Sequence, residues 1–519
     1  MRDPHAKTTC GAHLPALRAR CRWPASGWRA LLQPVGTAAT FSPAGPVRAL
    51  LVESLPRWER GRRARVPLPH FSTSVAVPAG GTAALVIGLD RAVPLSPGYA
   101  SQPYWWDGVD FPDGSPDPPP VEADIVVVGA GYTGLATAFE AARRGRAVVV
   151  FDRDDAVRGA SSRSGGMVLP GLKHDLTATL AMENGRALWD ETVTALEGLA
   201  RLIDEHQVEC DWMRTGHVEF AHHPRAARRF EEVARSFRSI GEDARFLKED
   251  ELGAEIGSDR FCGALVVERS ASIHPAKWAA ALQSMAMAAG ASVIGRCAVH
   301  RVEVTAGGYS LDTARGPIRS REVVLATNAA TDRSPSRWLG RRILPVGSYI
   351  IATEPLERDV AASLIPRGRM CFDSRNFLSY WRLSPDGRRL LFGGRTSFAP
   401  TTVEQARDRL YALMTAVHPQ LSGVAVDRAW GGEVALTYDR MPHLGRHPTT
   451  GVVYAMGYCG TGVALSTHFG RVVARHLTGD GDLGPFAGRR WPTVPLPARL
   501  PGLLPVAGLW YQARDALGI

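Results

Sequence analysis

The sequence contains few cysteines, and none lies close to another. Its 519 residues include seven cysteines, an odd number at wide spacing, and no two of them form a CxxC pair. This pattern excludes the usual disulfide frameworks and the usual zinc-binding motifs. We therefore expect no metal centre, and we expect a protein of the reducing cytoplasm.

The sequence also lacks a long hydrophobic run. No apolar segment approaches the roughly 20 residues that a membrane-spanning helix needs. The overall hydrophobic content is nevertheless 45%. A chain of this length and composition can bury large cores, so we expect a globular protein of two or three domains without a transmembrane segment.

Acidic residues are scarce at the beginning of the chain. Residues 1–85 contain 12 Lys/Arg and 3 Asp/Glu, a net charge of +9, whereas the whole chain carries +10. The rest is electrically balanced and gives no reason to expect a nucleic-acid partner. Because the segment also contains ten prolines, we expect residues 1–94 to be a disordered basic arm or the product of translation from an upstream start. The prolines argue against the amphipathic helix of a transit peptide.

Glycines mark the first functional motif. Gly129, Gly131 and Gly134 occupy the positions of G-x-G-x-x-G, between a β-branched apolar run at 125–128 and a helical pattern at 135–144. The first glycine permits a sharp turn, the second lets a pyrophosphate approach the backbone, and the third lets the helix pack closely on the strand. The helix then directs the positive end of its dipole at the phosphates.

A second apolar run at 147–151 ends at Asp152, which Arg153 follows. An acid at the end of this strand can accept both hydroxyls of an adenosine ribose. Strand, turn, helix, strand and acid thus occur in the order of a dinucleotide-binding βαβ unit. The same residues also suit a nicotinamide cofactor.

Two further loops of small residues fit a cofactor site. The segment 159–167 can wrap a phosphate or support a flat ring, and the loop at 457–462 precedes a helical pattern at 464–477, so that a second helix N-terminus faces an electron-rich group. From these loops and the predicted hairpin at 298–313 we take as further cofactor-binding residues Ser161, Ser162, Arg163, Gly166, Met167, Val299, Gly460, Thr461 and Gly462.

The remaining patterns predict packing elements. Apolar residues at three- and four-residue steps predict one long helix over 178–206, and shorter helices over 224–240, 275–289 and 401–417. Several strands are expected between 343 and 394. Within them, strand alternation places Tyr380 and Arg382 on one face and Trp381 on the other.

Four motifs together resemble a known family. They are Val128-Gly-Ala-Gly-Tyr-Thr-Gly-Leu, Gly159-Ala-Ser-Ser-Arg-Ser-Gly-Gly, Leu325-Ala-Thr-Asn-Ala and Gly457-Tyr-Cys-Gly-Thr-Gly-Val. In this order they are similar to those of the flavin-dependent amine and amino-acid oxidoreductases, which include D-amino-acid, glycine and sarcosine oxidases. Through Ser379-Tyr-Trp-Arg-Leu-Ser and the segment 430–445 the chain most resembles the γ-glutamylputrescine oxidase subgroup.

The resemblance implies an α/β fold, in which an FAD-binding Rossmann-like domain is interleaved with a substrate domain on a mixed or antiparallel sheet. We expect the FAD domain at 95–206, 271–340 and 431–482, the substrate domain at 207–270 and 341–430, and a tail at 483–519. The stretch 434–437, where sarcosine-oxidase relatives tether their flavin, contains no cysteine. FAD is therefore expected to bind noncovalently.

One departure from the family pattern concerns the substrate. Relatives that oxidise α-amino acids place a carboxylate-clamping arginine three residues before the position of Thr437, where this chain has Val434. Valine cannot form a bidentate carboxylate clamp. We therefore expect a small amine, such as a γ-glutamylputrescine-like or other polyamine derivative, to be oxidised to an imine and then an aldehyde. Oxygen or another acceptor would reoxidise the flavin.

Three residues are candidates for catalysis: Glu433 to hold a substrate ammonium, and Tyr380 and Arg382 to line the pocket. Each also has a structural alternative, which is a salt bridge for Glu433, a sheet-face core for Tyr380 and simple exposure for Arg382. Three other functions stay open. They are a D-amino-acid or glycine-type oxidase or dehydrogenase, an NAD(P)-dependent dehydrogenase, and a binding module without redox activity.

Overall fold

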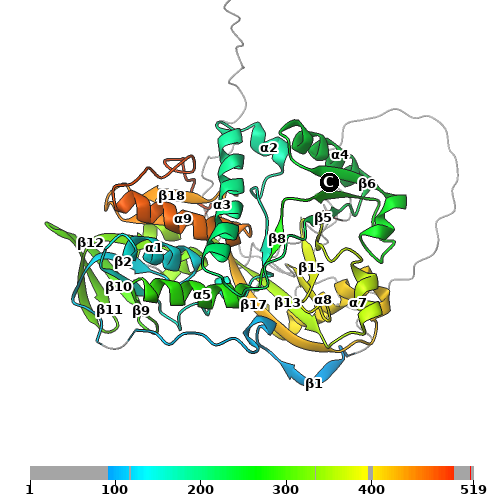
Figure 1. Cartoon of the computed structure of the whole chain (residues 1–519), viewed down its shortest axis with the longest axis horizontal. Coiled ribbons are helices and arrows are strands. Elements are labelled where there is room, and N and C mark those ends of the chain that lie inside the picture. The colour runs from blue at the N-terminus through cyan, green and yellow to red at the C-terminus, as the bar shows by residue number, and fades with distance from the viewer. Residues whose placement is uncertain (1–91, 116–117, 334, 395–400, 496–514, 516–519) are drawn as a thin grey trace, which may run out of the picture. The chain divides into compact units, whose positions relative to one another are not determined.

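The computed structural model describes residues 92–115, 118–333, 335–394, 401–495 and 515. The chain divides into two units, 1–85 and 86–519, and all described residues belong to the second. Two large sheets organise that unit (Figure 1). The predicted basic arm at 1–94 lies almost wholly outside the described residues.

The first sheet has eight strands and contains the predicted βαβ unit. Buried β-branched residues form its centre, where β2, β3, β9, β12 and β19 run parallel, while β18 is antiparallel to β19. Its far end is a meander of β10, β11 and β12. The strands are β2 (Glu122–Val128), β3 (Val148–Phe151), β9 (Ser292–Ile294), β10 (Val299–Thr305), β11 (Gly308–Thr313), β12 (Gly316–Leu325), β18 (His443–Arg446) and β19 (Val453–Met456).

Helices cover one face of this sheet. Their apolar sides form a continuous core with the strands, because α1 packs against α5, α9 and β3, and α9 also contacts α3. These helices are α1 (Tyr132–Ala142), α3 (Gly185–Glu205), α5 (Pro275–Ala288) and α9 (Gly462–Leu477). The opposite face packs on the meander through a second apolar cluster.

The second sheet has nine strands in the order β1-β17-β13-β16-β15-β14-β5-β7-β6. Most neighbours are antiparallel, and the pairs β1–β17 and β14–β5 are parallel. The strands are β1 (Leu95–Ala100), β5 (His217–Phe220), β6 (Ala244–Lys248), β7 (Gly263–Val267), β13 (Leu344–Thr353), β14 (Met370–Asp373), β15 (Ser379–Leu383), β16 (Leu390–Gly394) and β17 (Val426–Leu436).

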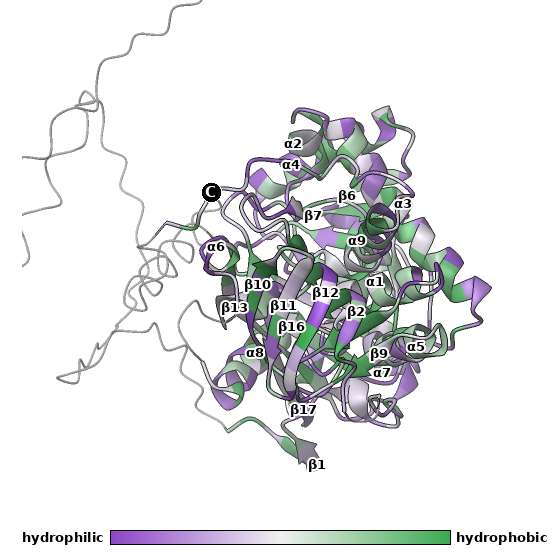
Figure 2. Ribbon diagram, turned by 90° about the vertical axis from the view of Figure 1, so that its left-hand side faces the viewer, coloured by the Kyte–Doolittle hydropathy of each residue, from purple (hydrophilic) through white to green (hydrophobic). Residues whose placement is uncertain are grey.

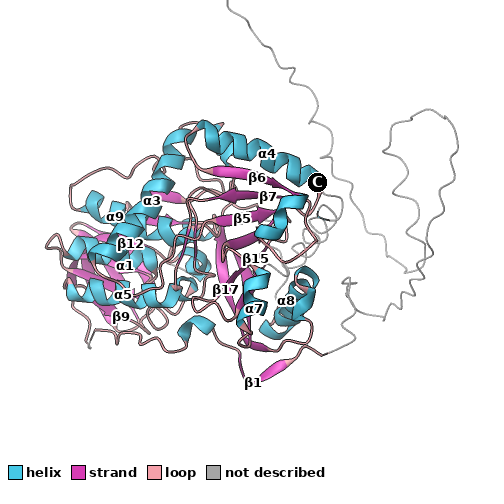
Figure 3. Cartoon of the chain, turned by 45° about the vertical axis from the view of Figure 1, so that its right-hand side comes forward, coloured by secondary structure: helices cyan, strands magenta, loops and turns pink. Residues whose placement is uncertain are grey.

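Alternating side chains divide this sheet into two faces. One face carries Trp381, Phe392 and Val218 and packs under α7 (Arg358–Leu364) and α8 (Val403–Val417). The other face packs in part under α4 (Pro224–Ser239), which lies along β6 and β7 (Figure 3). Hydrophilic and hydrophobic segments alternate along α3 and α4, as expected for half-buried helices (Figure 2).

Short elements complete the described part. They are α2 (Leu176–Leu180), α6 (Arg337–Gly340), β4 (Met167–Val168) paired with β8 (Ala271–Ser272), and the 3-10 helices Tyr104–Trp106, Ala160–Ser162, Glu249–Ala254, Asn328–Arg333 and Pro419–Leu421. Within the described ranges, no helix is both long and apolar enough to cross a bilayer.

The predicted α/β fold with interleaved domains is confirmed. After β1, which belongs to the nine-stranded sheet, the chain enters the eight-stranded sheet, and it then passes to the nine-stranded sheet and back twice. The exact domain boundaries stay a prediction, and two of them fit the sheets poorly. β1 pairs with β17 in the nine-stranded sheet, although 95–206 was assigned to the FAD domain, and β17 continues across the expected boundary at 430.

The predicted single helix over 178–206 is wrong. The structure has two helices, α2 and α3, and the turn between them places Asn184 at a φ of +56°. Gly185 follows, where any Cβ would overlap the carbonyl oxygen of Thr179. The apolar spacing continues across this turn, so periodicity alone does not show the break.

Candidate active site

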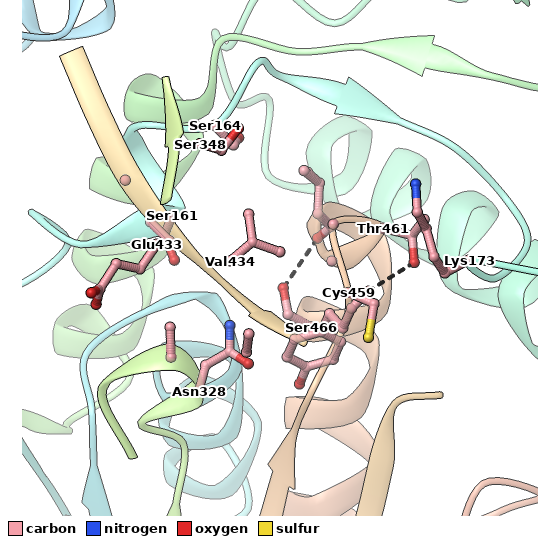
Figure 4. A pocket seen from close by; sticks show the side chains of 18 of the residues that line it. Ser161, Ser164, Lys173, Asn328, Ser348, Glu433, Val434, Cys459, Thr461 and Ser466 are labelled. Carbon is pink, nitrogen blue, oxygen red and sulfur yellow. Dashed lines mark hydrogen bonds between the residues drawn. The ribbon is translucent and has the colours of Figure 1, made fainter. Parts of the chain in front are cut away.

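A cavity of about 1500 Å³ runs from the carboxyl ends of the parallel strands in the eight-stranded sheet to one face of the nine-stranded sheet. The β2–α1 turn, the end of β3, the loop 157–169, β17 and the loop 458–463 line one part of it. Residues of β5, β14 and β15 line the other part. Figure 4 shows the region where β17 and the α9 N-terminus meet.

The β2–α1 turn brings a helix N-terminus to the cavity. Gly129 has a φ of +108°, which favours glycine, and a Cβ on Gly134 would overlap the carbonyl oxygen of Gly129. At Gly131 a Cβ would lie 3.0 Å from Ser161 Oγ, the same oxygen that accepts a hydrogen bond from the Tyr132 N–H at 3.1 Å. Gly131 thus keeps the backbone open where the cavity meets the turn.

Asp152 faces the cavity at the end of β3. Its Oδ2 accepts the Ala130 N–H at 2.7 Å and its Oδ1 accepts the Asp154 N–H at 3.0 Å. Burial raises the pKa of this carboxyl group, while the two hydrogen bonds oppose that rise. Each oxygen retains lone pairs for a further donor, so the group can accept two ribose hydroxyls. Arg153 and Val299 line the same end of the cavity.

Hydrogen bonds on the side away from the cavity fix the small-residue loop at 159–167. Ser162 does not line the cavity, since its Oγ donates to the Val157 carbonyl at 2.5 Å and accepts from Trp106 Nε1 at 3.1 Å. Arg163 does line it, and its guanidinium donates to the carbonyls of Arg158 and Gly431. Ser161 and Met167 also face the cavity. The loop is therefore fixed at its back, with its small side chains toward the cavity.

The loop before α9 provides the second helix N-terminus. Tyr458 OH lies 2.7 Å from Thr133 Oγ1 on α1, and the Cys459 N–H donates to the Ala435 carbonyl on β17 at 3.1 Å. Gly460 has a φ of +100°. Gly460, Thr461 and Gly462 all line the cavity. The two helix N-termini are thus joined to each other and face one space.

This part of the cavity fits a dinucleotide cofactor on structural grounds. It offers backbone N–H groups at two helix ends for a pyrophosphate and a ring oxygen, an acid for a ribose, and glycine positions that any side chain would fill. The arrangement defines the protein class as dinucleotide-binding.

The family follows from the sequence. Residues 124–476 match the family model described as "FAD dependent oxidoreductase" (DAO). The chain belongs to this family, and FAD is its cofactor. This result favours a flavin over the nicotinamide alternative.

Two relatives extend the match over most of their own length. The chain is 32% identical to a probable oxidoreductase, OrdL, of Haemophilus influenzae, over 72% of this chain and 87% of that protein. It is 30% identical to the gamma-glutamylputrescine oxidoreductase of Escherichia coli, over 77% and 94% respectively.

Solved structures agree in fold. Glycine oxidase from Geobacillus kaustophilus superposes with a TM-score of 0.62 at 24% identity, over 72% of this chain and 99% of that one. L-proline dehydrogenase from P. horikoshii gives a TM-score of 0.61 at 20% identity, over 71% and 96%.

Two of the three predicted catalytic residues line the cavity, but the structure does not bring them together. Tyr380 lies over Gly393, and its OH is 3.1 Å from Ser348 Oγ. The side chains of Glu433 and Val434 leave β17 in opposite directions (Figure 4). Because Val434 pairs with Val346 and Gly432 with Ser348, the face shared with Tyr380 is that of Val434. Glu433 is exposed on the other side.

Arg382 does not line the cavity. It is buried, and its Nη1 donates to the carbonyls of Gly166 and Ile273 at 3.0 and 3.1 Å. Burial lowers the pKa of this guanidinium to about 10. The expectation that Arg382 lines the pocket is corrected, although strand alternation did place it on the face of Tyr380. Gly166 and Gly134 were also expected to bind the cofactor, and neither lines the cavity. Gly166 packs against the Ile273 carbonyl, and Gly134 packs against the Gly129 carbonyl.

Sequence analysis missed several polar residues that line the cavity. Ser348, Lys173, Glu219 and Arg375 come from four separate segments. Glu219 had a detectable signal, since it is the single acid in the strand His217-Val-Glu-Phe, whose other members are a histidine and apolar residues. The others stand in ordinary polar surroundings in the sequence and show no such signal.

Proposed function

We propose that this chain oxidises the carbon–nitrogen bond of a small amine that has no carboxylate on the reacting carbon, such as the free amine end of γ-glutamylputrescine or another polyamine derivative. The amine R–CH2–NH2 would lose two electrons and two protons to become the imine R–CH=NH. Water would then convert the imine to an aldehyde and ammonia. FAD, when bound, takes up the electron pair as a hydride equivalent.

Val434 carries this proposal. It projects from β17 into the cavity beside Val346, in the region bordered by the α9 N-terminus and Ser348 (Figure 4). Two valines give an apolar floor that accommodates methylene groups. An α-carboxylate bound over this floor would lose its hydration without gaining a charged partner there, which is costly.

Tyr380 and Ser348 are the residues that we propose to orient the amine. Each hydroxyl both donates and accepts hydrogen bonds, and the two oxygens lie 3.1 Å apart. A neutral amine can donate to one hydroxyl and accept from the other. Such contacts would fix the direction of the reacting C–H bond. Holding the reacting groups in a productive orientation lowers the barrier of the reaction.

The name of the Escherichia coli relative, gamma-glutamylputrescine oxidoreductase, supports the choice of amine. Noncovalent binding of FAD is also part of the proposal. So are a cytoplasmic location and reoxidation by oxygen or another acceptor. The five described cysteines form no disulfides, in agreement with a reducing compartment.

Anaerobic mixing of the yellow protein with candidate substrates tests the proposal. Amines without an α-carboxylate should bleach the flavin absorbance faster than any common D- or L-amino acid. If an amino acid bleaches it at least as fast as every amine, the proposal fails. Arg375, which lines the cavity, would then be the first candidate for the carboxylate clamp, in place of Arg382. A colourless protein that turns over only with added NAD would exclude the flavin mechanism altogether.

A further inference from the structure

Glu219 stands out on the wall of the cavity that the nine-stranded sheet forms. It faces the cavity from β5, next to Phe372 on one neighbouring strand and Leu265 on the other. Phe230, Val233 and Phe237 of α4 line the same end. Glu219 is thus a carboxylate in a largely apolar wall.

No described residue makes a hydrogen bond or an ion pair with the Glu219 carboxylate. The nearby charged residues are Lys173, Asp175 and Arg229. Asp175 is already neutralised by a bidentate contact from Arg229, and Lys173 acts on Glu219 only as a neighbouring charge that lowers its pKa. Burial has the larger effect and raises the pKa of Glu219. His217 on the same strand face is committed to Ser270.

The register of the sheet connects Glu219 with the proposed reaction end. Ile350, Gly393, Tyr380, Phe372 and Glu219 are successive cross-strand partners on β13, β16, β15, β14 and β5. Cross-strand partners place their side chains on one face of a sheet. At the usual strand spacing, Glu219 lies about 10 Å from the Tyr380 strand and about 19 Å from the Ser348 strand.

We propose that Glu219 binds a second cationic group of the substrate, at the far end of an aliphatic chain whose first amine reacts near Tyr380 and Ser348. This assignment rests on the proposed function and narrows its substrate to elongated molecules with two separated positive charges. Phe372 and the apolar residues of α4 would contact the methylene groups between them. The carboxylate would gain the charged partner that the described protein does not provide.

A comparison of two long amines that differ only at the end remote from the reacting amine tests this assignment. Decanediamine and aminodecanol have the same length and the same reacting amine, and differ only in the charge of the far end. Wild-type protein should show a higher rate of flavin reduction at limiting concentration with decanediamine. Putrescine is too short to reach Glu219 and serves as the short reference.

Glu219→Gln keeps the size of the side chain and removes its charge. The ratio of the flavin-reduction rate with decanediamine to that with aminodecanol should fall by tenfold or more. The rate with putrescine should change little. Glu231→Gln is the matched control. Glu231 is an exposed residue of α4 that pairs with Arg235, so the ratio should be that of wild type.

Independent readouts separate the outcomes. Because Glu219→Gln removes a half-buried charge without a close partner, the melting temperature should not fall. In Glu219→Asp the carboxylate lies closer to the β5 backbone, so the preferred diamine should have a longer chain. This variant replaces Glu219→Gln if the latter cannot be purified with flavin. An unchanged ratio in the flavin-loaded Glu219→Gln variant would overturn the assignment while leaving amine oxidation intact. If no amine reduces the wild-type flavin, the proposed function itself fails, and the assignment with it.

Discussion

Arg382 Nη1 donates a hydrogen bond to the carbonyl oxygen of Gly166 at a distance of 3.0 Å. The bond joins β15 of the substrate sheet to the loop that borders the cofactor part of the cavity. Gly166 has a φ of +66°, and a Cβ there would overlap the Ile273 carbonyl, which accepts from the same guanidinium nitrogen. The two parts of the active site therefore share one buried cation.

Replacing Arg382 should affect FAD retention more than chemistry. Arg382→Met removes the donors of both carbonyls, and hydrogen bonds to a charged group contribute about 1.5–3 kcal/mol each. We expect a lower flavin content after purification and a lower melting temperature. The rate per bound flavin should change little, and Arg382→Lys should restore part of the flavin content. A normal flavin content together with a large loss of rate per flavin would instead indicate direct substrate contact.

Gly131→Val should remove most of the bound FAD. The new Cβ would lie 3.0 Å from Ser161 Oγ, and its methyl groups would occupy the space that a pyrophosphate needs. The ratio of flavin absorbance to protein absorbance measures the effect. Gly253→Ala is a control, because no atom lies near its added Cβ. Full flavin content in Gly131→Val would place the cofactor elsewhere.

Acid should destabilise the fold through its buried histidines. Burial lowers the pKa of His217, His274 and His418 to about 4 from 6.5. Between those values the unfolded state binds more protons than the folded state, so stability falls as the pH falls. Each group accounts for about 2 kcal/mol between pH 7 and 5. Urea unfolding at the two pH values measures the sum, which Asp373 offsets in part because burial raises its pKa to about 6.

His418 permits a control for this prediction. Its ring is fully buried against Trp381, and neither ring nitrogen makes a hydrogen bond of normal geometry among the described residues, although the Gly257 backbone lies near enough to oppose the lowering of its pKa. Replacement by an apolar side chain therefore sacrifices no hydrogen bond. His418→Leu should unfold at higher urea concentration at pH 5 and show a weaker pH dependence than wild type. Equal pH dependence would exclude His418 as a contributor.

Tyr380 and Glu433 should respond differently to loss of their polar groups. Tyr380→Phe removes the hydroxyl beside Ser348, so we expect slower flavin reduction and weaker amine binding. Glu433→Gln should have a smaller effect, because the carboxylate leaves β17 away from the face of Tyr380 (Figure 4). Stopped-flow rates per flavin give the comparison. A larger loss in Glu433→Gln would support the role in holding ammonium that the sequence suggested.

The sequence predicts the cofactor part of the site much better than the substrate part, for a physical reason. Gly129, Gly131 and Asp152 lie within one βαβ unit, where short-range turn chemistry places them. Ser348, Tyr380 and Glu219 come from β13, β15 and β5, and the sheet order does not follow the sequence order. Alternation gives the face of each strand correctly, as for Tyr380 and Arg382. It cannot show which neighbour covers a side chain, and for Arg382 that neighbour is the Gly166 loop.

Val434→Arg should reverse the charge preference at the reaction end. A guanidinium projecting beside Val346 would attract carboxylate-bearing substrates and repel cationic amines. Flavin reduction by glycine or D-alanine should become faster than in wild type, and reduction by putrescine slower, with the ratio of the two changing by tenfold or more, or about 1.4 kcal/mol. Val434→Met controls for volume, because it fills the same space without charge, and it should slow both substrate classes alike. If Val434→Arg and Val434→Met change the ratio equally, the position acts through its size, and the absence of a cation there would no longer explain the choice of substrate.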